Sequence, residues 1–232
     1  MTTSLITGGN KGLGRETARR LHAAGHDVWI GARDEQAGRA TADELGVRFV
    51  ALDVTRQDTI DAAVATIAAA GGLDVLVNNA AIADGMATPF VDTDVAAMNA
   101  IMDTNVLGPM RLAIACWPLL QASPAPVVVN VSSSLGSLGR STTDPELFEH
   151  GYLPVAYPAS KAALNMVTVK LARALPRARV NAVNPGFSAT DLNDHLGPLT
   201  VEVGVEPIVQ AALLGPDGPT GTFFEAEGVV AW

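Results

Sequence analysis

The chain has 232 residues and a formal net charge of -9, and 48% of its residues are hydrophobic against 17% charged. This composition supports a sizeable buried core and argues against a disordered chain. The negative charge provides no basic field for a phosphate backbone, so neither nucleic acid nor an anionic membrane is an expected partner. No linker-like stretch divides the sequence, and we expect residues 1–232 to form a single domain.

The longest uncharged stretch, residues 112–139, contains three prolines and many polar residues, so it is not expected to cross a membrane. Residues 1–14 lack the cationic start and apolar run of a signal peptide, and we expect a cytoplasmic protein. Cys116 is the single cysteine and lies in an apolar run, which predicts a small buried thiol and no disulfide. The histidines have no ligand spacing, so no metal site is predicted.

Short runs rich in Val, Ile and Leu alternate with longer segments of helical periodicity. The predicted strands are residues 4–7, 27–32, 48–52, 73–78, 126–131 and 179–183, with a last one at 221–225. The predicted helices are residues 12–24, 35–45, 57–70, 98–121 with a break near Pro109, 157–175 and 202–214. Strict alternation implies right-handed crossovers, and therefore an α/β chain with a single doubly wound Rossmann fold: a parallel sheet of about seven strands with helices on both faces. Ligands bind such sheets outside the carboxyl ends of the strands.

The first predicted strand runs into a glycine-rich turn, residues 7–14, within which a helix begins. Gly8 permits a tight turn, Gly12 lets the backbone approach a pyrophosphate, and Gly14 lets helix and sheet pack closely. Free N–H groups at the start of the helix would face the phosphates. An ordinary strand-to-helix turn is the alternative, but the position directly after the first strand favours a dinucleotide site.

The end of the second strand indicates which dinucleotide is bound. An NAD enzyme normally has a carboxylate there, whereas this chain has Ala32, followed by Arg33. Arg33 and Lys11 of the glycine turn could converge on a 2'-phosphate, each contributing about 1.5 to 3 kcal/mol. We therefore predict NADP(H). Two alternatives stay open: a shift of one residue would place Asp34 at the strand end, and Arg33 could be a solvated residue at a helix start.

Tyr157 and Lys161 are four residues apart, which places them on one face of a helix. A nearby ammonium would lower the pKa of the phenol from about 10, so that Tyr157 could exchange a proton with a carbonyl oxygen. The spacing alone is weak evidence, because such pairs occur by chance on many helices. Tyr152, the other tyrosine, has no lysine four residues on and is a poor rival.

The order of further motifs resembles the short-chain dehydrogenase/reductase family from Ser4 to about Leu192. These motifs are residues 7–14, Asp53-Val54, residues 78–81, Asn105, Ser132-Ser133, residues 157–161, residues 184–186 and Thr190. Within the family, the Gly-Gly-Asn-Lys turn, the Ala-Arg-Asp after the second strand and the terminal Trp232 look most like the carbonyl reductase branch.

The resemblance implies that Tyr157 donates a proton to the carbonyl oxygen and that Ser133 hydrogen bonds the same oxygen, with Ser132 as the alternative. It implies that Lys161 also holds the nicotinamide ribose and that Asn105 supports a proton-relaying water. The residues that it places at the cofactor are Gly8, Asn10, Lys11, Gly12, Leu13, Gly14, Arg33, Asp53, Val54, Asn79, Ala80, Ala81, Tyr157, Lys161, Pro185, Gly186 and Thr190. Ala81 replaces the usual glycine of this family without removing a functional group.

Two segments are predicted to form the substrate walls, residues 134–156 and 187–200. Ser133 and Tyr157 are 24 residues apart, about twice the usual family spacing, and the surplus contains Asp144, Glu146 and Glu149. A solvated loop is the alternative for this surplus, which by resemblance also favours a monomer over a homo-oligomer. The second wall offers Phe187, Leu192 and Leu196, which favour small apolar ketones or aldehydes.

The predicted function is hydride transfer between NADPH and a small-molecule carbonyl, or the reverse reaction on the alcohol. An epimerase or dehydratase using the same tyrosine and lysine is a rival, although 42 residues after Thr190 are few for the larger substrate domain of such enzymes. A non-catalytic NADPH-binding protein is the other rival. It would have little need for Asn105, Ser133, Tyr157 and Lys161 together.

Overall fold

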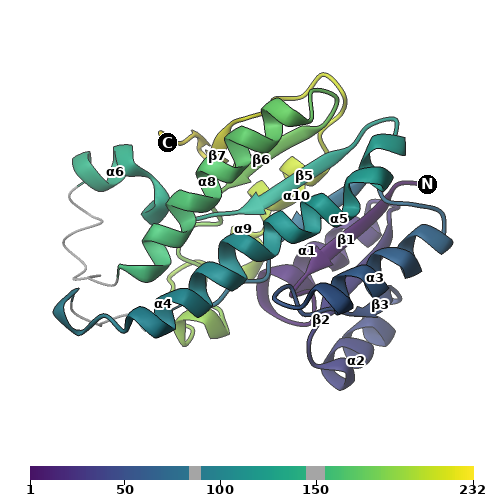
Figure 1. The fold of residues 1–232 in the computed structure, drawn as a ribbon, viewed down its shortest axis with the longest axis horizontal. Coiled ribbons are helices and arrows are strands. Elements are labelled where there is room, and N and C mark those ends of the chain that lie inside the picture. Colours follow the sequence, from purple (N-terminus) through teal and green to yellow (C-terminus); the bar gives the residue numbers. More distant parts are fainter. Residues whose placement is uncertain (84–89, 145–154) are drawn as a thin grey trace.

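The computed structural model describes residues 1–83, 90–144 and 155–232, which surround one eight-stranded sheet of order β3-β2-β1-β4-β5-β6-β7-β8 (Figure 1). Its strands are β1 (Thr3–Thr7), β2 (Asp27–Ala32), β3 (Arg48–Ala51), β4 (Val75–Asn78), β5 (Val127–Val131), β6 (Arg179–Val183), β7 (Phe223–Glu225) and β8 (Gly228–Val229). The first seven are parallel, as predicted, and β8 adds an unpredicted antiparallel edge. The strand order reverses between β1 and β4, which is where a doubly wound sheet binds ligands.

The helices follow the predicted order with local differences. They are α1 (Gly12–Ala23), α2 (Glu35–Leu45), α3 (Gln57–Ala69), α4 (Val95–Met102), α5 (Gly108–Ala122), α6 (Leu138–Thr143), α8 (Ala156–Ala174), α9 (Val201–Gly204) and α10 (Glu206–Ala212). Short 3-10 turns are η1 (Phe90–Asp92), η3 (Ser134–Gly136) and η4 (Asp191–Asn193), and η2 (Asp103–Leu107) is a π-helical turn. The expected break near Pro109 is confirmed, because η2 separates α4 from α5 there. The helix predicted at 202–214 is instead two short helices.

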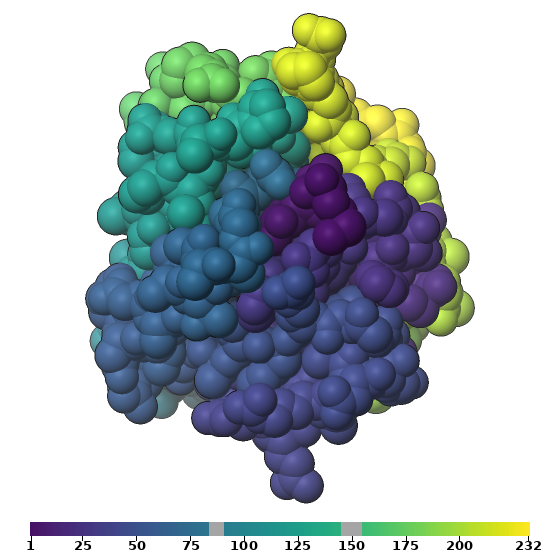
Figure 2. All heavy atoms as spheres, turned by 90° about the vertical axis from the view of Figure 1, so that its right-hand side faces the viewer, coloured from purple at the N-terminus to yellow at the C-terminus, as the bar shows by residue number. Residues whose placement is uncertain are grey.

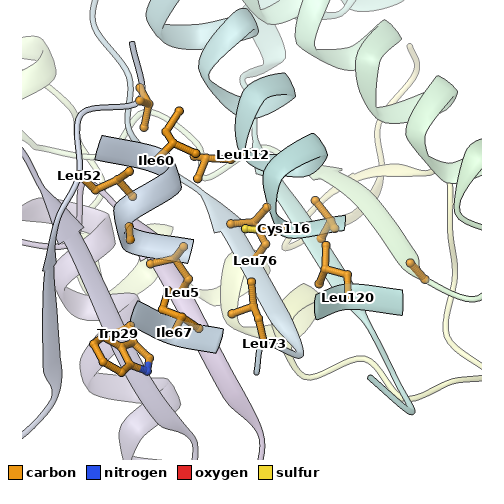
Figure 3. Close-up of a cluster of buried hydrophobic side chains, with 14 of the residues drawn as sticks. Leu5, Trp29, Leu52, Ile60, Ile67, Leu73, Leu76, Leu112, Cys116 and Leu120 are labelled. Carbon is orange, nitrogen blue, oxygen red and sulfur yellow. The ribbon is translucent and has the colours of Figure 1, made fainter. Parts of the chain in front are cut away.

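Alternate residues of the central strands enter two cores on opposite faces of the sheet. In β1, Leu5 packs against α3 and α5, whereas Ile6 packs against α1 and α10. The helices accordingly cover the sheet on both sides (Figure 1). Figure 3 shows Cys116 of α5 beside Leu76 of β4 in the first core. The predicted buried thiol is confirmed, and burial raises the pKa of Cys116 to about 12.

The amino ends of the strands form the face opposite the predicted site, where the first residues of the chain lie at the surface (Figure 2). At this end Asp74 connects the start of β1 to the end of α5, because it accepts hydrogen bonds from the Thr3 N–H at 2.8 Å and the Ser123 hydroxyl at 2.6 Å. No helix in the described part of the chain is long and apolar enough to cross a membrane.

Candidate active site

The carboxyl ends of the parallel strands open into a cleft of about 860 Å³. It is lined by the glycine turn, the end of β2, the segment after β4, the β5–η3 segment, α8 and residues 184–198. Every expected site residue lines this cleft except Gly14 and Asn105. The motifs that are scattered along the sequence therefore meet at one place.

The glycine turn has the expected geometry. Gly8 and Gly12 have φ values of 64° and 52°, in the left-handed region that favours glycine. Asn79 Nδ2 donates to the Thr7 and Gly8 carbonyls, at 2.9 and 3.3 Å, and so holds the turn against the end of β4. A Cβ added at Gly14 would lie 2.5 Å from Asn79 Nδ2, so Gly14 has the packing role that the sequence indicated and not a place in the cleft.

The end of β2 resolves the alternative left open for Asp34. β2 ends at Ala32, and Asp34 is the N-cap of α2, where its carboxylate accepts a hydrogen bond from the Ala37 N–H at 2.9 Å. Ala32 and the exposed Arg33 line the cleft, whereas Asp34 does not. The strand end therefore carries a cation and no carboxylate.

Lys11 differs from expectation, since its Nζ forms an ion pair of 2.6 Å with Asp191 of η4. Lys11 is the largest cause that holds the pKa of Asp191 below its ordinary value. His195 Nε2 lies 3.0 Å from the same carboxylate. A Cβ on Gly12 would be 3.6 Å from Thr190 Cγ2, so the glycine turn and the wall segment approach each other here. Neither Asp191 nor His195 had been assigned a role from the sequence.

The two candidate serines have different hydrogen-bond partners. The Ser133 side chain is hydrogen bonded to Tyr157. Ser132 is 1% exposed, and its hydroxyl donates instead to Asn165 Oδ1 at 2.6 Å. Of the two serines, Ser133 is the one placed beside the tyrosine.

Burial controls the protonation of the tyrosine–lysine pair. It raises the pKa of Tyr157 to about 12, although the Ser133 hydrogen bond opposes it, and lowers the pKa of Lys161 to about 7. Lys161 Nζ donates to the Val131 carbonyl at 2.7 Å and lies over the phenol ring, 5.4 Å from its centroid. The pKa of Tyr157 is therefore shifted upward here, opposite to the predicted direction, because desolvation outweighs the Ser133 hydrogen bond.

Asn105 lies in η2, beneath the cleft, and is 1% exposed. Its side chain exchanges two hydrogen bonds of 2.9 Å with the backbone of Ile82 and donates to Ser160 Oγ at 3.0 Å. These contacts connect α8 to the segment after β4. The water relay at Asn105 stays a prediction.

Described residues of both predicted wall segments line the cleft. Phe187, Leu192 and Leu196 come from one segment, as expected, and Asp144 comes from the other. Arg140 also lines the second wall, where it donates to Asp144 at 3.0 Å and to Glu225 at 3.1 Å. Arg140 was not predicted from the sequence, because its partner Glu225 comes from a distant segment. Glu146, Glu149 and Tyr152 lie outside the described residues.

The last residues of the chain brace this second wall. The Ser137 hydroxyl donates to the Ala231 carbonyl at 2.6 Å, and the Gly139 N–H donates to the Trp232 carbonyl at 2.9 Å. The Trp232 ring packs on Phe223 with centroids 5.7 Å apart. The start of α6 is thus fixed to the end of the chain.

Known proteins resemble this chain over nearly its whole length. (-)-Isopiperitenone reductase of Mentha piperita is 32% identical over 305 aligned residues, with 98% of this chain and 97% of that protein covered. The NADPH carbonyl reductase 1 of Sus scrofa is 32% identical over 275, with 99% and 93% covered. Both aligned lengths exceed 232, so each relative contains residues that this chain lacks.

Among solved structures, NADPH-bound carbonyl reductase from chicken fatty liver superposes with a TM-score of 0.87 at 27% identity, covering 100% of this chain and 99% of that one. The family profile described as short chain dehydrogenase matches residues 2–198. The chain therefore belongs to the short-chain dehydrogenase family of oxidoreductases.

Proposed function

We propose that this protein, folded as one domain, is an NADPH-dependent reductase of small, predominantly apolar ketones or aldehydes, with Tyr157 as the proton donor. The observation that carries the proposal is the Tyr157–Ser133 hydrogen bond beside the buried Lys161, in a cleft that also contains the glycine turn. NADPH-linked carbonyl reductases among the relatives support it.

The cofactor half of the cleft fits a phosphorylated dinucleotide. The N-cap of α1 is Lys11, whose side chain has no hydrogen-bond acceptor, so the first N–H groups of this helix remain available to a pyrophosphate. Arg33 at a strand end without a carboxylate favours a 2'-phosphate. The bound cofactor would supply the hydride. Its other expected contacts are with Gly8, Asn10, Leu13, Asp53, Val54, Asn79, Ala80, Ala81, Pro185 and Gly186.

The catalytic half fits proton donation at neutral pH. A phenol whose pKa is about 12 remains protonated and can give its proton to the oxygen on which negative charge develops. Ser133, already bonded to Tyr157, would donate to the same oxygen. Lys161 would hold the nicotinamide ribose with its buried ammonium.

The substrate half combines an apolar wall with a polar one. Phe187, Leu192 and Leu196 offer apolar surface to the body of a ketone. The guanidinium of Arg140 is already held by two carboxylates, which makes it a poor site for an anionic substrate. This arrangement favours neutral carbonyl compounds over keto acids.

The test is the initial rate of NADPH and NADH oxidation with apolar ketones, aldehydes, quinones and small keto acids. We expect turnover with NADPH on neutral apolar carbonyls. Tyr157→Phe should bind NADPH as the wild type does but lose at least about a hundredfold in kcat. Tight NADPH binding without turnover on any carbonyl would contradict the proposal and favour a binding protein or an epimerase.

A further inference from the structure

The buried face of α8 is unusually polar. Besides Leu164 and two alanines, it buries Ser160, Lys161, Asn165 and Thr168, none more than 4% exposed. A helix that covers a parallel sheet normally buries apolar side chains, because a buried polar group destabilises the fold unless it is hydrogen bonded. These side chains are all bonded, and three of them bond to one short segment.

That segment runs from the end of β5 through η3, residues 130–136, and contains Ser133. Asn130 Nδ2 donates to Thr168 Oγ1 at 2.8 Å, and Lys161 Nζ donates to the carbonyl of Val131 at 2.7 Å. Asn130 in turn accepts a hydrogen bond of 2.8 Å from Asn78 of β4. The residues just before Ser133 are therefore held to α8 one after another.

Asn165 holds the chain on both sides of Ser133. Its Oδ1 accepts the Ser132 hydroxyl at 2.6 Å, and its Nδ2 donates to the Gly136 carbonyl at 3.1 Å. The side chain of Asn165 is 4% exposed, and both its amide oxygen and its amide nitrogen bond to residues that flank Ser133.

The same stretch packs directly on the backbone of α8. A Cβ added at Gly136 would lie 2.6 Å from both the carbonyl carbon and the Cβ of Lys161. The turn that carries Ser133 therefore has little freedom to move toward α8. The hydrogen bonds of Asn165 to Ser132 and Gly136 oppose movement of this turn along the axis of α8.

We propose that Asn165 is a positioning residue, which keeps the Ser133 hydroxyl in hydrogen-bonding register with Tyr157 by holding Ser132 and Gly136. The inference rests on the proposed reductase function. Asn165 does not line the cleft and acts only through Ser133.

The test compares Asn165→Leu and Ser132→Ala with Thr168→Val in the full-length protein. Thr168→Val is the matched control, because it removes a buried hydrogen bond between the same helix and the same segment at Asn130, three positions before Ser133, and leaves the bonds of Ser132 and Gly136 in place. For each variant we would measure kcat, KM and Kd for NADPH, and the thermal midpoint. A misplaced reacting group lowers kcat by about ten- to a hundredfold, whereas Kd for NADPH should stay within about twofold. Thr168→Val should lose a similar amount of thermal stability and keep its kcat.

A double substitution sharpens the test. In a Ser133→Ala background, Asn165→Leu should cause almost no further loss of kcat, because its effect passes through the missing hydroxyl. Should Asn165→Leu not fold, Ser132→Ala carries the same comparison with one hydroxyl removed.

Full additivity with Ser133→Ala, or a kcat for Asn165→Leu equal to that of Thr168→Val, would overturn the positioning role. A loss of kcat in Ser132→Ala that Asn165→Leu does not share would do so too, since it would mean that Ser132 acts directly. A wild type that binds NADPH but reduces no carbonyl would instead overturn the proposed function, and the inference with it.

Discussion

Lys11 and Asp191 are 180 positions apart in the chain, and their side chains meet as an ion pair of 2.6 Å at the edge of the cleft. The pair joins the glycine turn to the wall segment. It also occupies the lysine that we propose for a phosphate of the cofactor, so on that proposal Asp191 would compete with the cofactor for the same cation.

We expect Asp191→Asn to tighten NADPH binding. The substitution releases Lys11 and removes a negative charge from the path of an anionic ligand. Because both groups are more than half exposed, the gain should be modest, about two- to fivefold in Kd, and should shrink as salt is added. Binding can be followed by titration at low and high ionic strength. The control is Asp194→Asn, which removes a nearby charge at a position of φ 51° that asparagine tolerates. An equal gain in both variants would mean that only net charge matters.

Arg33→Ala should weaken NADPH binding far more than NADH binding. The loss of one charge-assisted hydrogen bond to a 2'-phosphate corresponds to about ten- to a hundredfold in Kd. Asp34→Ala provides the control, because it removes the cap of α2, which costs about 1 kcal/mol of stability, but should leave the ratio of the two affinities unchanged. Equal losses of affinity for NADPH and NADH in Arg33→Ala would mean that Arg33 does not contact the 2'-phosphate.

The pH dependence of kcat/KM for NADPH should report Lys161. With a pKa of about 7, its ammonium is present below neutral pH and is lost as the pH rises through 7, while Tyr157 stays protonated until about 12. Carbonyl reduction should therefore decline on the alkaline side with a midpoint near 7. Initial rates at limiting NADPH between about pH 5.5 and 9 measure this midpoint. A flat profile over that range would contradict it.

Lys161→Met should abolish turnover and stabilise the protein. The folded-state pKa of Lys161 lies below its ordinary value of 10.5, so the unfolded chain binds more protons between about pH 7 and 10.5, and wild-type stability rises with pH across that window. The advantage of methionine, about 1 to 4 kcal/mol at neutral pH, should therefore shrink by pH 9.5. Urea unfolding of both proteins at pH 7 and 9.5 measures whether the variant is the more stable one and whether the difference in stability shrinks at the higher pH. A variant less stable than wild type at pH 7 would show that the bond to the Val131 carbonyl outweighs the burial of the charge.

Much of the fold follows from local pattern. The strands at Asp27–Ala32 and Arg179–Val183 and the helix at Glu35–Leu45 match the predicted ranges residue for residue, because apolar runs and helical spacing mark them clearly. The short edge strand β8 and helix α6 carry no such pattern. They depend on distant contacts, such as that of Arg140 with Glu225, 85 positions away.

The site was predictable in its motifs but not in its pairings. The glycine turn, Ser133, Tyr157 and Lys161 are recognisable in sequence order, and the fold brings them to one cleft. Which acid neutralises Lys11 depends on the path of a loop, which no spacing reveals. The direction of the pKa shift of Tyr157 likewise depends on how deeply both partners are buried.

The hydrogen bonds between the end of the chain and α6 determine where a tag can be attached without affecting the cleft. An affinity tag or fusion joined to Trp232, whose carbonyl accepts the Gly139 N–H, would pull on one wall of the cleft. Met1 is 92% exposed, and the amino end of the chain lies at the end of the sheet away from the cleft (Figure 1). A purification tag or a surface-immobilisation anchor therefore belongs at the amino end, away from α6 and the cleft.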